Sequence, residues 1–316
     1  MKVTKLNYNF DIGIAAISWV NDDIPGLGDD TPLDDVLKEM NELGYIATEK
    51  GRTLPDNQDE LKSILSKHHL TLASQFVSVK FSDASLHNEE IAKFKKQAQF
   101  LKEMDCDYVI VCEMAGSMHW DPRVSNHKDI HRLDDSGWNA LVKGLHEAGA
   151  YCNELGLELV YHPHAGTVIE QKEEVDKLMS MTDTQYINLL YDTGHALYGN
   201  YNPYELLENY MDRIKYVHYK DVRLDVLKQC RIEGKNFREE VLEGIFTVPG
   251  DGVIDFKPIM KKLMQSGYKG WVIVEAEQDP EKANPYQYAK KAIEYLHETE
   301  EQIKEELSKA NGGIHL

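Results

Sequence analysis

The chain has 316 residues, of which 42% are hydrophobic, and its formal net charge is −19. This length and composition exclude a disordered chain and are compatible with one large α/β domain or two smaller domains. The acidic excess argues against nucleic acid or an anionic membrane as partner, because both require a basic surface for binding. A small neutral molecule, or one bound through a metal cation, is the compatible class of ligand.

The cysteines and the N-terminal segment indicate a cytoplasmic protein. The four cysteines show no CxxC spacing and no paired framework, so we expect reduced thiols. The first residues, MKVTKLNYNF, lack the apolar core of a signal peptide, and no apolar run is long enough to span a membrane.

Short apolar runs alternate with amphipathic segments along most of the chain. The apolar runs predict eight β-strands, at residues 12–18, 45–49, 70–79, 107–113, 157–164, 187–192, 214–220 and 271–277. The amphipathic segments predict helices at residues 31–43, 57–68, 87–104, 136–155, 170–180, 203–211, 256–266 and 284–308. Several of these helices are followed by a glycine directly before the next strand, as in ELGY and ELGL, which is typical of helix C-caps.

Two longer segments interrupt this alternation, at residues 114–135 and 221–253. The second segment predicts one helix, in DVLKQCRIEGKNFREEVLEG, followed by the glycine-rich turn VPGDGV. Long segments after strands often cover a substrate, although a plain surface insertion is about as frequent on length alone.

Eight strands that alternate with helices predict a parallel sheet, and eight such units close most naturally as a (β/α)8 or TIM barrel. The main alternative is a doubly wound open sheet. No GxGxxG motif follows the first strand, and GLGDD has too few glycines and too many acids to bind a phosphate. The sequence therefore predicts a single α/β domain over residues 1–316, with a barrel core at about 11–300 and a tail at 309–316.

Polar residues stand at the ends of the predicted strands. In a barrel these positions converge on one mouth, where active sites form. The side chains expected there are Ser18, Trp19, Glu49, Lys80, Glu113, His162, His164, Asp192, His195, His218, Glu275 and Glu277. Because residues i and i+2 of an extended chain share a face, His162 and His164 are expected to face the same space.

Histidines and carboxylates without cysteine suit a divalent metal such as Mn, Co, Zn or Fe(II). Without a cation, ionisable groups at consecutive strand ends would repel one another or stay unpaired. His164 is expected on the substrate, because a second ligand from the same strand would close the open coordination position. His195 would orient the substrate or support a ligand. The candidate ligands, one from each of the last four strands, are His162, Asp192, His218 and Glu275.

These residues also have structural alternatives. A histidine at a strand end is more often hydrogen-bonded in the core than bound to metal, and a glutamate there can simply cap the next helix. Trp19 could instead pack in the core, and Lys80 could lie on the surface. Glu113 could form an ion pair with a neighbouring lysine or arginine. The acidic runs NDD, GDD and LDD suit helix caps or solvated faces. The histidines expected to be exposed are His68, His69, His119, His127 and His131.

Several segments resemble one protein family. DTGH, VHxKD and VPGDG are typical of the xylose-isomerase-like TIM-barrel superfamily of sugar isomerases and epimerases. SWVNDDIP and VEAEQDP are similar to its inosose dehydratase family. The segments that carry this resemblance, spread from about residue 11 to 300, are GIAAISWVNDDIPGLG (13–28), MSMTD (179–183), YDTGHA (191–196), VHYKDVR (217–223), FTVPGDGVIDF (246–256) and GWVIVEAEQDP (270–280).

The resemblance places the superfamily's metal ligands on Asp192 of YDTGH, His218 of VHYKD and Glu275 of IVEAE. Many related sugar isomerases have a glutamate where this chain has His162, and the dehydratase-like branch shares this departure. In the epimerases, two ligating glutamates can pass a proton across the substrate carbon. His162 therefore disfavours symmetric two-base epimerisation.

The resemblance implies the dehydration of 2-keto-myo-inositol (scyllo-inosose) to a trihydroxycyclohexane-dione in inositol catabolism. A metal, Mn or Co by the resemblance, would polarise the ketone, a base would remove the α-proton, and an acid would assist loss of the β-hydroxyl. The candidates for proton transfer, which the sequence does not rank, are Glu275, Glu277, His164 and His195. The candidates for substrate binding are Trp19, Glu49, Lys80, Glu113, Lys220 and Arg223. Lys80 or Lys220 would stabilise charge on the departing oxygen. Glutathione is associated with the family, although the sequence shows no thiol-binding site.

Three alternatives stay open on the sequence. A metal-dependent epimerase or isomerase of the same superfamily would share the fold and the metal. An endonuclease-IV-like phosphodiesterase would need a basic face, against which the net charge of −19 argues. A non-catalytic sugar-binding barrel would keep the binding site without turnover. The expected partner is a small cyclic polyol or ketose, and a homo-oligomer is compatible with an acidic barrel of this type.

Overall fold

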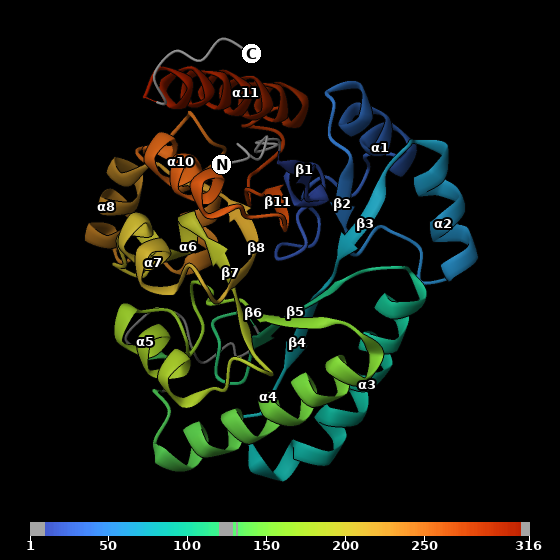
Figure 1. Ribbon diagram of the computed structural model, residues 1–316, viewed down its shortest axis with the longest axis vertical. Coiled ribbons are helices and arrows are strands. Elements are labelled where there is room, and N and C mark those ends of the chain that lie inside the picture. Colours follow the sequence, from blue (N-terminus) through green and yellow to red (C-terminus); the bar gives the residue numbers. More distant parts are fainter. Residues whose placement is uncertain (1–9, 120–128, 131, 311–316) are drawn as a thin grey trace, which may run out of the picture.

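The computed structural model describes residues 10–119, 129–130 and 132–310. Its centre is a ring of short parallel strands enclosed by helices (Figure 1). One seven-stranded sheet has the order β1-β11-β8-β7-β6-β5-β4, and β2 pairs with β3. The Ile46 N–H donates to the Ile12 carbonyl over 3.1 Å, which joins the β2 segment to β1. Because β3 runs on into β4, the ring closes and the predicted (β/α)8 barrel is confirmed.

The strands lie within or close to the predicted apolar runs. Their bounds are β1 Asp11–Ile14, β2 Ala47–Glu49, β3 Thr71–Ser74, β4 Phe76–Val79, β5 Tyr108–Glu113, β6 Glu158–Tyr161, β7 Asn188–Asp192, β8 Ile214–Tyr219 and β11 Trp271–Val274. The helices that follow them agree with prediction to within about two residues, at α1 Leu33–Glu42, α2 Gln58–Lys67, α3 His87–Glu103, α4 Asp135–Leu155, α5 Lys172–Met181, α7 Pro203–Tyr210, α10 Phe256–Ser266 and α11 Pro285–Ala310. No helix of the described chain is both long and apolar enough to cross a membrane.

The structure differs from prediction where the chain turns over the barrel mouth. Strand β1 ends at Ile14, and Ala16–Ser18 forms the short 3-10 helix η1 in place of further strand; a second short one, η2, spans Ala84–Leu86. An unpredicted helix, α6 Thr193–Tyr198, follows β7 at once, because Asp192 accepts from the His195 N–H and caps it.

The single helix predicted in 221–253 is wrong. The segment holds two helices, α8 Leu224–Glu233 and α9 Phe237–Leu242, between two short antiparallel strands, β9 Asp221–Val222 and β10 Phe246–Thr247. Gly234 ends α8 with a φ of 70°, a left-handed conformation that suits glycine. Asn236 then starts α9 with a capping box, so one continuous helix cannot form.

Two other predicted segments lie partly beyond what the structure describes. In the predicted loop 114–135, residues 120–128 and 131 are outside the described residues. The tail predicted at 309–316 begins as helix, because α11 continues to Ala310, and residues 311–316 are likewise outside.

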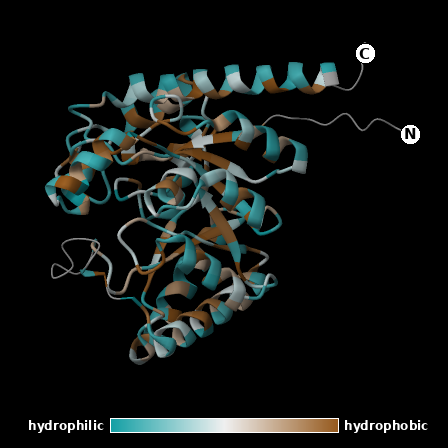
Figure 2. Cartoon of the chain, turned by 90° about the vertical axis from the view of Figure 1, so that its left-hand side faces the viewer, coloured by the Kyte–Doolittle hydropathy of each residue, from teal (hydrophilic) through white to brown (hydrophobic). Residues whose placement is uncertain are grey.

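The barrel interior is a compact layer of apolar side chains, and it determines which residues reach the mouth. Its buried members are Ala15, Ile17, Ala47, Ala73, Ile110, Val160, Leu190, Tyr216 and Ile273. A larger cluster packs between the strands and the helices, and in Figure 2 the strands are correspondingly hydrophobic while most helices carry a hydrophilic face. Successive side chains of a strand alternate between these two clusters. Two residues beyond the interior layer, the inward positions are therefore Glu49, His162, Asp192, His218 and Glu275.

Helix α4 approaches the barrel closely through Gly144. A Cβ placed on Gly144 would lie 2.5 Å from Cγ of Phe81, which is fully buried. We expect Gly144→Ala to lower the free energy of unfolding by about 1–2 kcal/mol, because overpacking outweighs the helix propensity of alanine. Denaturant unfolding measures the change. In a Phe81→Leu background, Gly144→Ala should lower the free energy of unfolding by less. An unchanged loss of stability would exclude the contact with Phe81 as its cause.

Candidate metal centre and active-site cavity

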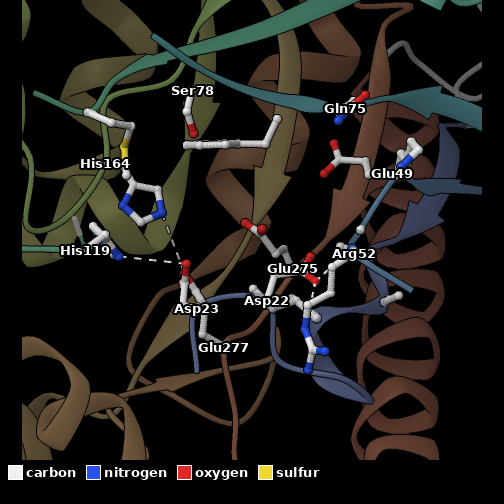
Figure 3. Close-up of a pocket in the computed structure, with 17 residues that line it drawn as sticks. Asp22, Asp23, Glu49, Arg52, Gln75, Ser78, His119, His164, Glu275 and Glu277 are labelled. Atoms are coloured by element: carbon white, nitrogen blue, oxygen red, sulfur yellow. Dashed lines mark hydrogen bonds and ion pairs between the residues drawn. The ribbon is translucent and has the colours of Figure 1, made fainter. Parts of the chain in front are cut away.

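A cavity of about 450 Å³ opens at the carboxyl ends of the strands (Figure 3). Its polar wall comes mainly from segments that follow six different strands. After β1 these are Asp22 and Asp23, after β2 Lys50 and Arg52, and after β5 His119; the other polar lining residues are Glu49, Gln75, Ser78, His164, Glu275 and Glu277. The cavity is thus where active sites form in barrels of this kind.

Four predicted ligands form one cluster on adjacent strands. His162 Nε2 and His218 Nδ1 lie 3.5 and 3.6 Å from Asp192 Oδ2. Glu275 Oε2 lies 2.8 Å from His218 Nδ1. Asp192 and His218 are paired residues of β7 and β8, and the Glu275 N–H donates to the Tyr219 carbonyl. Strand register therefore holds the cluster together.

Neighbouring groups fix the direction of these side chains. The second oxygen of Asp192, Oδ1, accepts from the His195 N–H, which leaves Oδ2 facing the cluster. His218 Nε2 lies 2.9 Å from Glu49 Oε1, and a carboxylate there favours the tautomer that presents Nδ1 to the cluster. The Tyr216 hydroxyl donates to the same Glu49 oxygen over 2.6 Å.

The donor set fits a divalent metal. Among the described residues, the buried atoms without a hydrogen-bond partner include all four that face the cluster, namely His162 Nε2, Asp192 Oδ2, His218 Nδ1 and Glu275 Oε2. Unsatisfied buried polar atoms are costly, and two imidazoles with two carboxylates suit first-row divalent ions. Burial lowers the pKa of His162 to about 4, so its imidazole is neutral at neutral pH, as a metal ligand must be.

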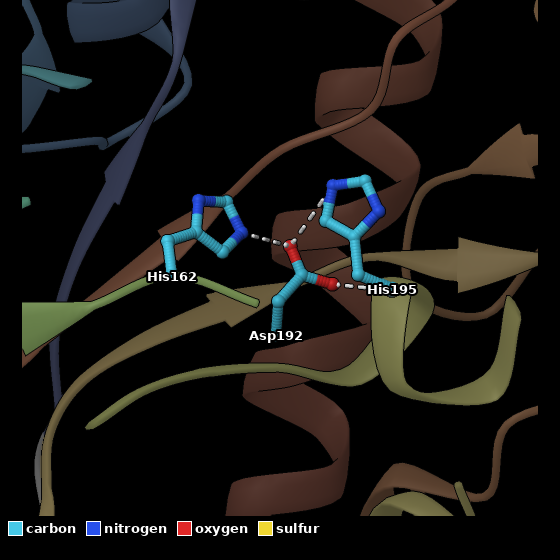
Figure 4. Close-up of side chains that lie close together, drawn as sticks. All are labelled: His162, Asp192 and His195. Carbon is cyan, nitrogen blue, oxygen red and sulfur yellow. Dashed lines mark hydrogen bonds and ion pairs between the residues drawn. The ribbon is translucent and has the colours of Figure 1, made fainter. Parts of the chain in front are cut away.

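A second cluster adjoins the first around Lys220, which is fully buried. Its ammonium lies 2.8 Å from Glu277 Oε1, 3.0 Å from Glu275 Oε2 and 3.5 Å from Asp192 Oδ2. It also lies 2.8 Å from His195 Nε2. Figure 4 shows the rings of His162 and His195 beside Asp192, which belongs to both clusters.

Charge pairing decides the protonation of these buried groups. Burial alone raises the pKa of Asp192 and Glu275, but the Lys220 ammonium lowers both well below their usual values. Burial likewise raises the pKa of Glu277 and Lys220 lowers it. The net result is a lowered pKa. Burial lowers the pKa of Lys220, yet attraction to Asp192 and Glu275 raises it above its usual value. The carboxylates are therefore ionised at neutral pH.

His164 lies in a different environment from His162. Its Nδ1 is 2.8 Å from the Ala165 carbonyl, and its Nε2 is 3.8 Å from Glu277 Oε1. Burial, followed by repulsion from His195, lowers its pKa well below the usual value. His164 lines the cavity and groups with His195 and Glu277, while the predicted split between a metal-binding His162 and a substrate-facing His164 stays a prediction.

The structure brings only part of the predicted substrate-binding set to the site. Glu49 lines the cavity, and Lys220 lies in the second cluster. Trp19 is 2% exposed and donates from Nε1 to Glu39, so it belongs to the core. Lys80 is exposed and is absent from the cavity lining; its backbone N–H donates to Glu90. Strand β4 ends before Lys80, which frees that side chain from the inward alternation.

Glu113 and Arg223 serve local structure instead. Glu113 is fully buried and accepts from the N–H and hydroxyl of Ser82 and from the Ala115 N–H. Arg223 donates to the Gly244 carbonyl, the Thr247 hydroxyl and Asp251, which holds the segment around β9 and β10 together. Neither side chain lines the cavity.

Several cavity residues were not predicted. Asp22 and Asp23, expected as caps or solvated residues in NDD, line the cavity, and so does His119, expected to be exposed. His68 is buried at 8% exposure and contacts Asp34, so its predicted exposure is also wrong. His69 is exposed as predicted, and His127 and His131 lie outside the described residues. Only the fold of the mouth loops identifies these residues, because they follow no strand-end pattern.

Removing one ligand should separate the roles of the two strand-end histidines. We expect His162→Ala to weaken Mn²⁺ or Co²⁺ binding by more than about 100-fold, because it deletes a direct ligand, whereas His164→Ala keeps the metal. Metal analysis after dialysis and isothermal titration measure both. Full metal content in His162→Ala together with its loss in His164→Ala would reverse the assignment.

Glu113 should make stability depend on pH. Burial raises the pKa of Glu113 to about 7 from 4.5, so the folded state retains a proton that the unfolded chain loses. The stability that the protonated Glu113 carboxyl contributes is fully present below its pKa in the unfolded chain. It is lost as the pH rises through its pKa in the folded protein. We expect the free energy of unfolding, relative to Glu113→Gln, to fall by about 3 kcal/mol between pH 4 and pH 8. Urea titrations of both proteins test this, and a constant difference would contradict it.

Comparisons with known proteins identify the family of the chain. The family model described as "Xylose isomerase-like TIM barrel" matches residues 28–299. An inosose dehydratase of Geobacillus kaustophilus is 59% identical over 288 residues, which cover 91% of this chain and 94% of that protein. Another, from Lacticaseibacillus casei (strain BL23), is 40% identical and covers 93% and 97% of the two chains.

Solved structures show the same fold at low sequence identity. The structure of an L-ribulose 3-epimerase matches with a TM-score of 0.71 at 13% identity and covers 98% of this chain and all of that one. The structure of an IolI protein with a bound zinc atom matches with a TM-score of 0.63 at 18% identity and covers 95% and 99%. With the family model and the close relatives, these observations lead to one conclusion. The chain belongs to the xylose isomerase-like TIM barrel family and, within it, to the inosose dehydratase family.

Proposed function

We propose that this chain is a metal-dependent hydro-lyase that removes water from 2-keto-myo-inositol and yields a trihydroxycyclohexane-dione. Its relatives at 59% and 40% identity are inosose dehydratases. The structural observation that carries the proposal is the asymmetry of the ligand cluster: the residue directly after β6 is the imidazole His162, whereas the one directly after β11 is the carboxylate Glu275. A symmetric pair of carboxylate bases for epimerisation is therefore lacking among the cluster residues.

The cavity wall suits a neutral polyhydroxylated substrate. Its carboxylates can each accept hydrogen bonds from substrate hydroxyls. The cations of the described wall are already paired, Lys50 with Asp56 over 2.7 Å and Arg52 with Asp29. A phosphorylated sugar would meet mainly negative charge, which favours an unphosphorylated cyclic ketose.

The metal site supports the first chemical step. His162, Asp192, His218 and Glu275 would hold a divalent metal, which would supply the Lewis acid that polarises the substrate ketone and acidifies its α-proton. We assign Mn or Co to this site. Glutathione is implied only by the family resemblance, and no residue of the cavity is assigned to it.

Glu277 is the base in this proposal. It lines the cavity and is kept ionised by Lys220, whose ammonium lies 2.8 Å from its Oε1. Lys220 itself does not line the cavity, so it acts by keeping Glu275 and Glu277 ionised. His164, 3.8 Å from Glu277, borders the substrate space. A homo-oligomer and a cytoplasmic location stay predictions from the sequence.

The proposal predicts a metal-dependent absorbance change. Chelator-treated protein, given scyllo-inosose with Mn²⁺ or Co²⁺, should form the ultraviolet-absorbing enolised dione, with and without reduced glutathione tested in parallel. Glu277→Gln should lower kcat by about 10²–10⁴-fold with its metal content intact, because the base is lost. The exposed Glu281→Gln is the matched control and should keep full activity.

Other outcomes would identify the alternatives. An epimerised or isomerised ketose without dione would indicate an epimerase. Tight substrate binding without any turnover, with either metal, would indicate a binding protein.

A further inference from the structure

A pair of titratable side chains lines the cavity outside the two clusters. Asp23 follows β1 and His119 follows β5, and Asp23 Oδ1 lies 3.8 Å from His119 Nδ1 (Figure 3). His119 Nε2 lies 3.0 Å from the Ala165 carbonyl, which can only accept, so Nε2 carries the hydrogen. The other ring nitrogen, Nδ1, faces Asp23.

The loop that carries Asp23 is held in place by Asn21. The Asn21 side-chain oxygen accepts from the backbone N–H groups of Asp23 and Ile24, each over 2.9 Å. Its amide donates to the Gln278 carbonyl over 3.4 Å, which ties the loop to the segment that carries Glu277. Asn21 is fully buried, so Asp23 occupies a defined position on the wall.

Partial burial of Asp23, whose side chain is 27% exposed, favours its protonated form. Burial raises the pKa of Asp23. The positive charges of His119 and Lys220 lower it, and the negative charges of Glu277 and Glu275 raise it. The net result is a raised pKa, with Asp22 as a further carboxylate on the same loop. Among the described residues, no lysine or arginine is ion-paired with Asp23. Asp23 thus retains its proton to a higher pH than an ordinary aspartate, whereas Lys220 keeps Glu277 ionised.

We propose that Asp23 is the catalytic proton donor to the hydroxyl that leaves, and that His119 is a positioning residue for its carboxyl. The proposal rests on the proposed dehydratase function. Glu277 takes the proton of the α-C–H bond, and that electron pair forms the C=C bond. The β-C–O bond breaks with its pair on oxygen, which takes the Asp23 proton and leaves as water. Glu277 then releases its proton to solvent, and Asp23 takes up a proton from solvent. The net change is therefore the loss of one water from the substrate.

Asp23→Asn separates this step from proton abstraction. In D₂O with Mn²⁺ and scyllo-inosose, we expect the variant to exchange the α-proton at a rate near wild type. Dione formation should fall by about 10²–10⁴-fold, because an amide cannot donate the proton. Asp30→Asn, an exposed site on the same loop, is the control that should keep both rates.

The remaining outcomes are decisive. Unchanged dione formation in Asp23→Asn overturns the role of Asp23, and so does an equal loss of exchange and elimination in a folded, metal-loaded variant. Failure of the wild-type protein to form dione would instead reject the dehydratase function itself.

His119→Gln tests the positioning role. We expect kcat to fall by up to about 100-fold with KM little changed, because the carboxyl loses its orientation. Removing the imidazole also removes an interaction that lowers the Asp23 pKa, so the alkaline limb of the kcat profile should move to higher pH. The groups that still face Asp23 are Asp22, Lys220, Glu275 and Glu277. An unmoved limb would leave His119 with a packing role only and overturn this part of the proposal.

Discussion

Three nearly dehydrated carboxylates at the barrel mouth depend on the ammonium of Lys220. Asp192 and Glu277 have side chains that are 2% and 1% exposed, and Glu275 is 13% exposed. Removing such charges from water costs several kcal/mol each unless they are paired. Lys220 lies within 3.5 Å of all three, and its own side chain is wholly buried. The ligand cluster and the proposed base therefore share one counter-charge, which couples metal binding to proton transfer.

The barrel layout explains why the ligand cluster could be predicted from sequence. An apolar run reveals a strand, and the two-residue alternation carries each inward column from the interior layer to the mouth, as from Val160 to His162 or from Leu190 to Asp192. The same rule fails where a strand ends early. Lys80 lies beyond the end of β4, and Trp19 follows a 3-10 turn that takes it into the core.

Loop residues were beyond this kind of prediction, for a physical reason. The position of Asp23 depends on the Asn21 side chain and its contact with Gln278, which lies 257 residues away in the sequence. His119 reaches the cavity by packing against Phe237 of α9, with ring centroids 4.7 Å apart. Phe237 lies in the 221–253 segment, for which a single helix was predicted. Neither contact leaves a periodic signal in the sequence. The acidic run NDD predicts caps or solvated residues, because a sequence does not show long-range partners; Asp22 is exposed, but both acids of the run also line the cavity.

The seam between the first and last strands has a consequence for the order in which the protein matures. The Ser18 hydroxyl donates to the Ala276 carbonyl and Asn21 to Gln278, and β1 pairs along its length with β11. Contacts of such high sequence separation form slowly. During synthesis, β1 therefore lacks this partner until β11 has been made. The ligand Glu275 and the proposed base Glu277 both follow β11, so a partly made chain that lacks this strand also lacks both carboxylates.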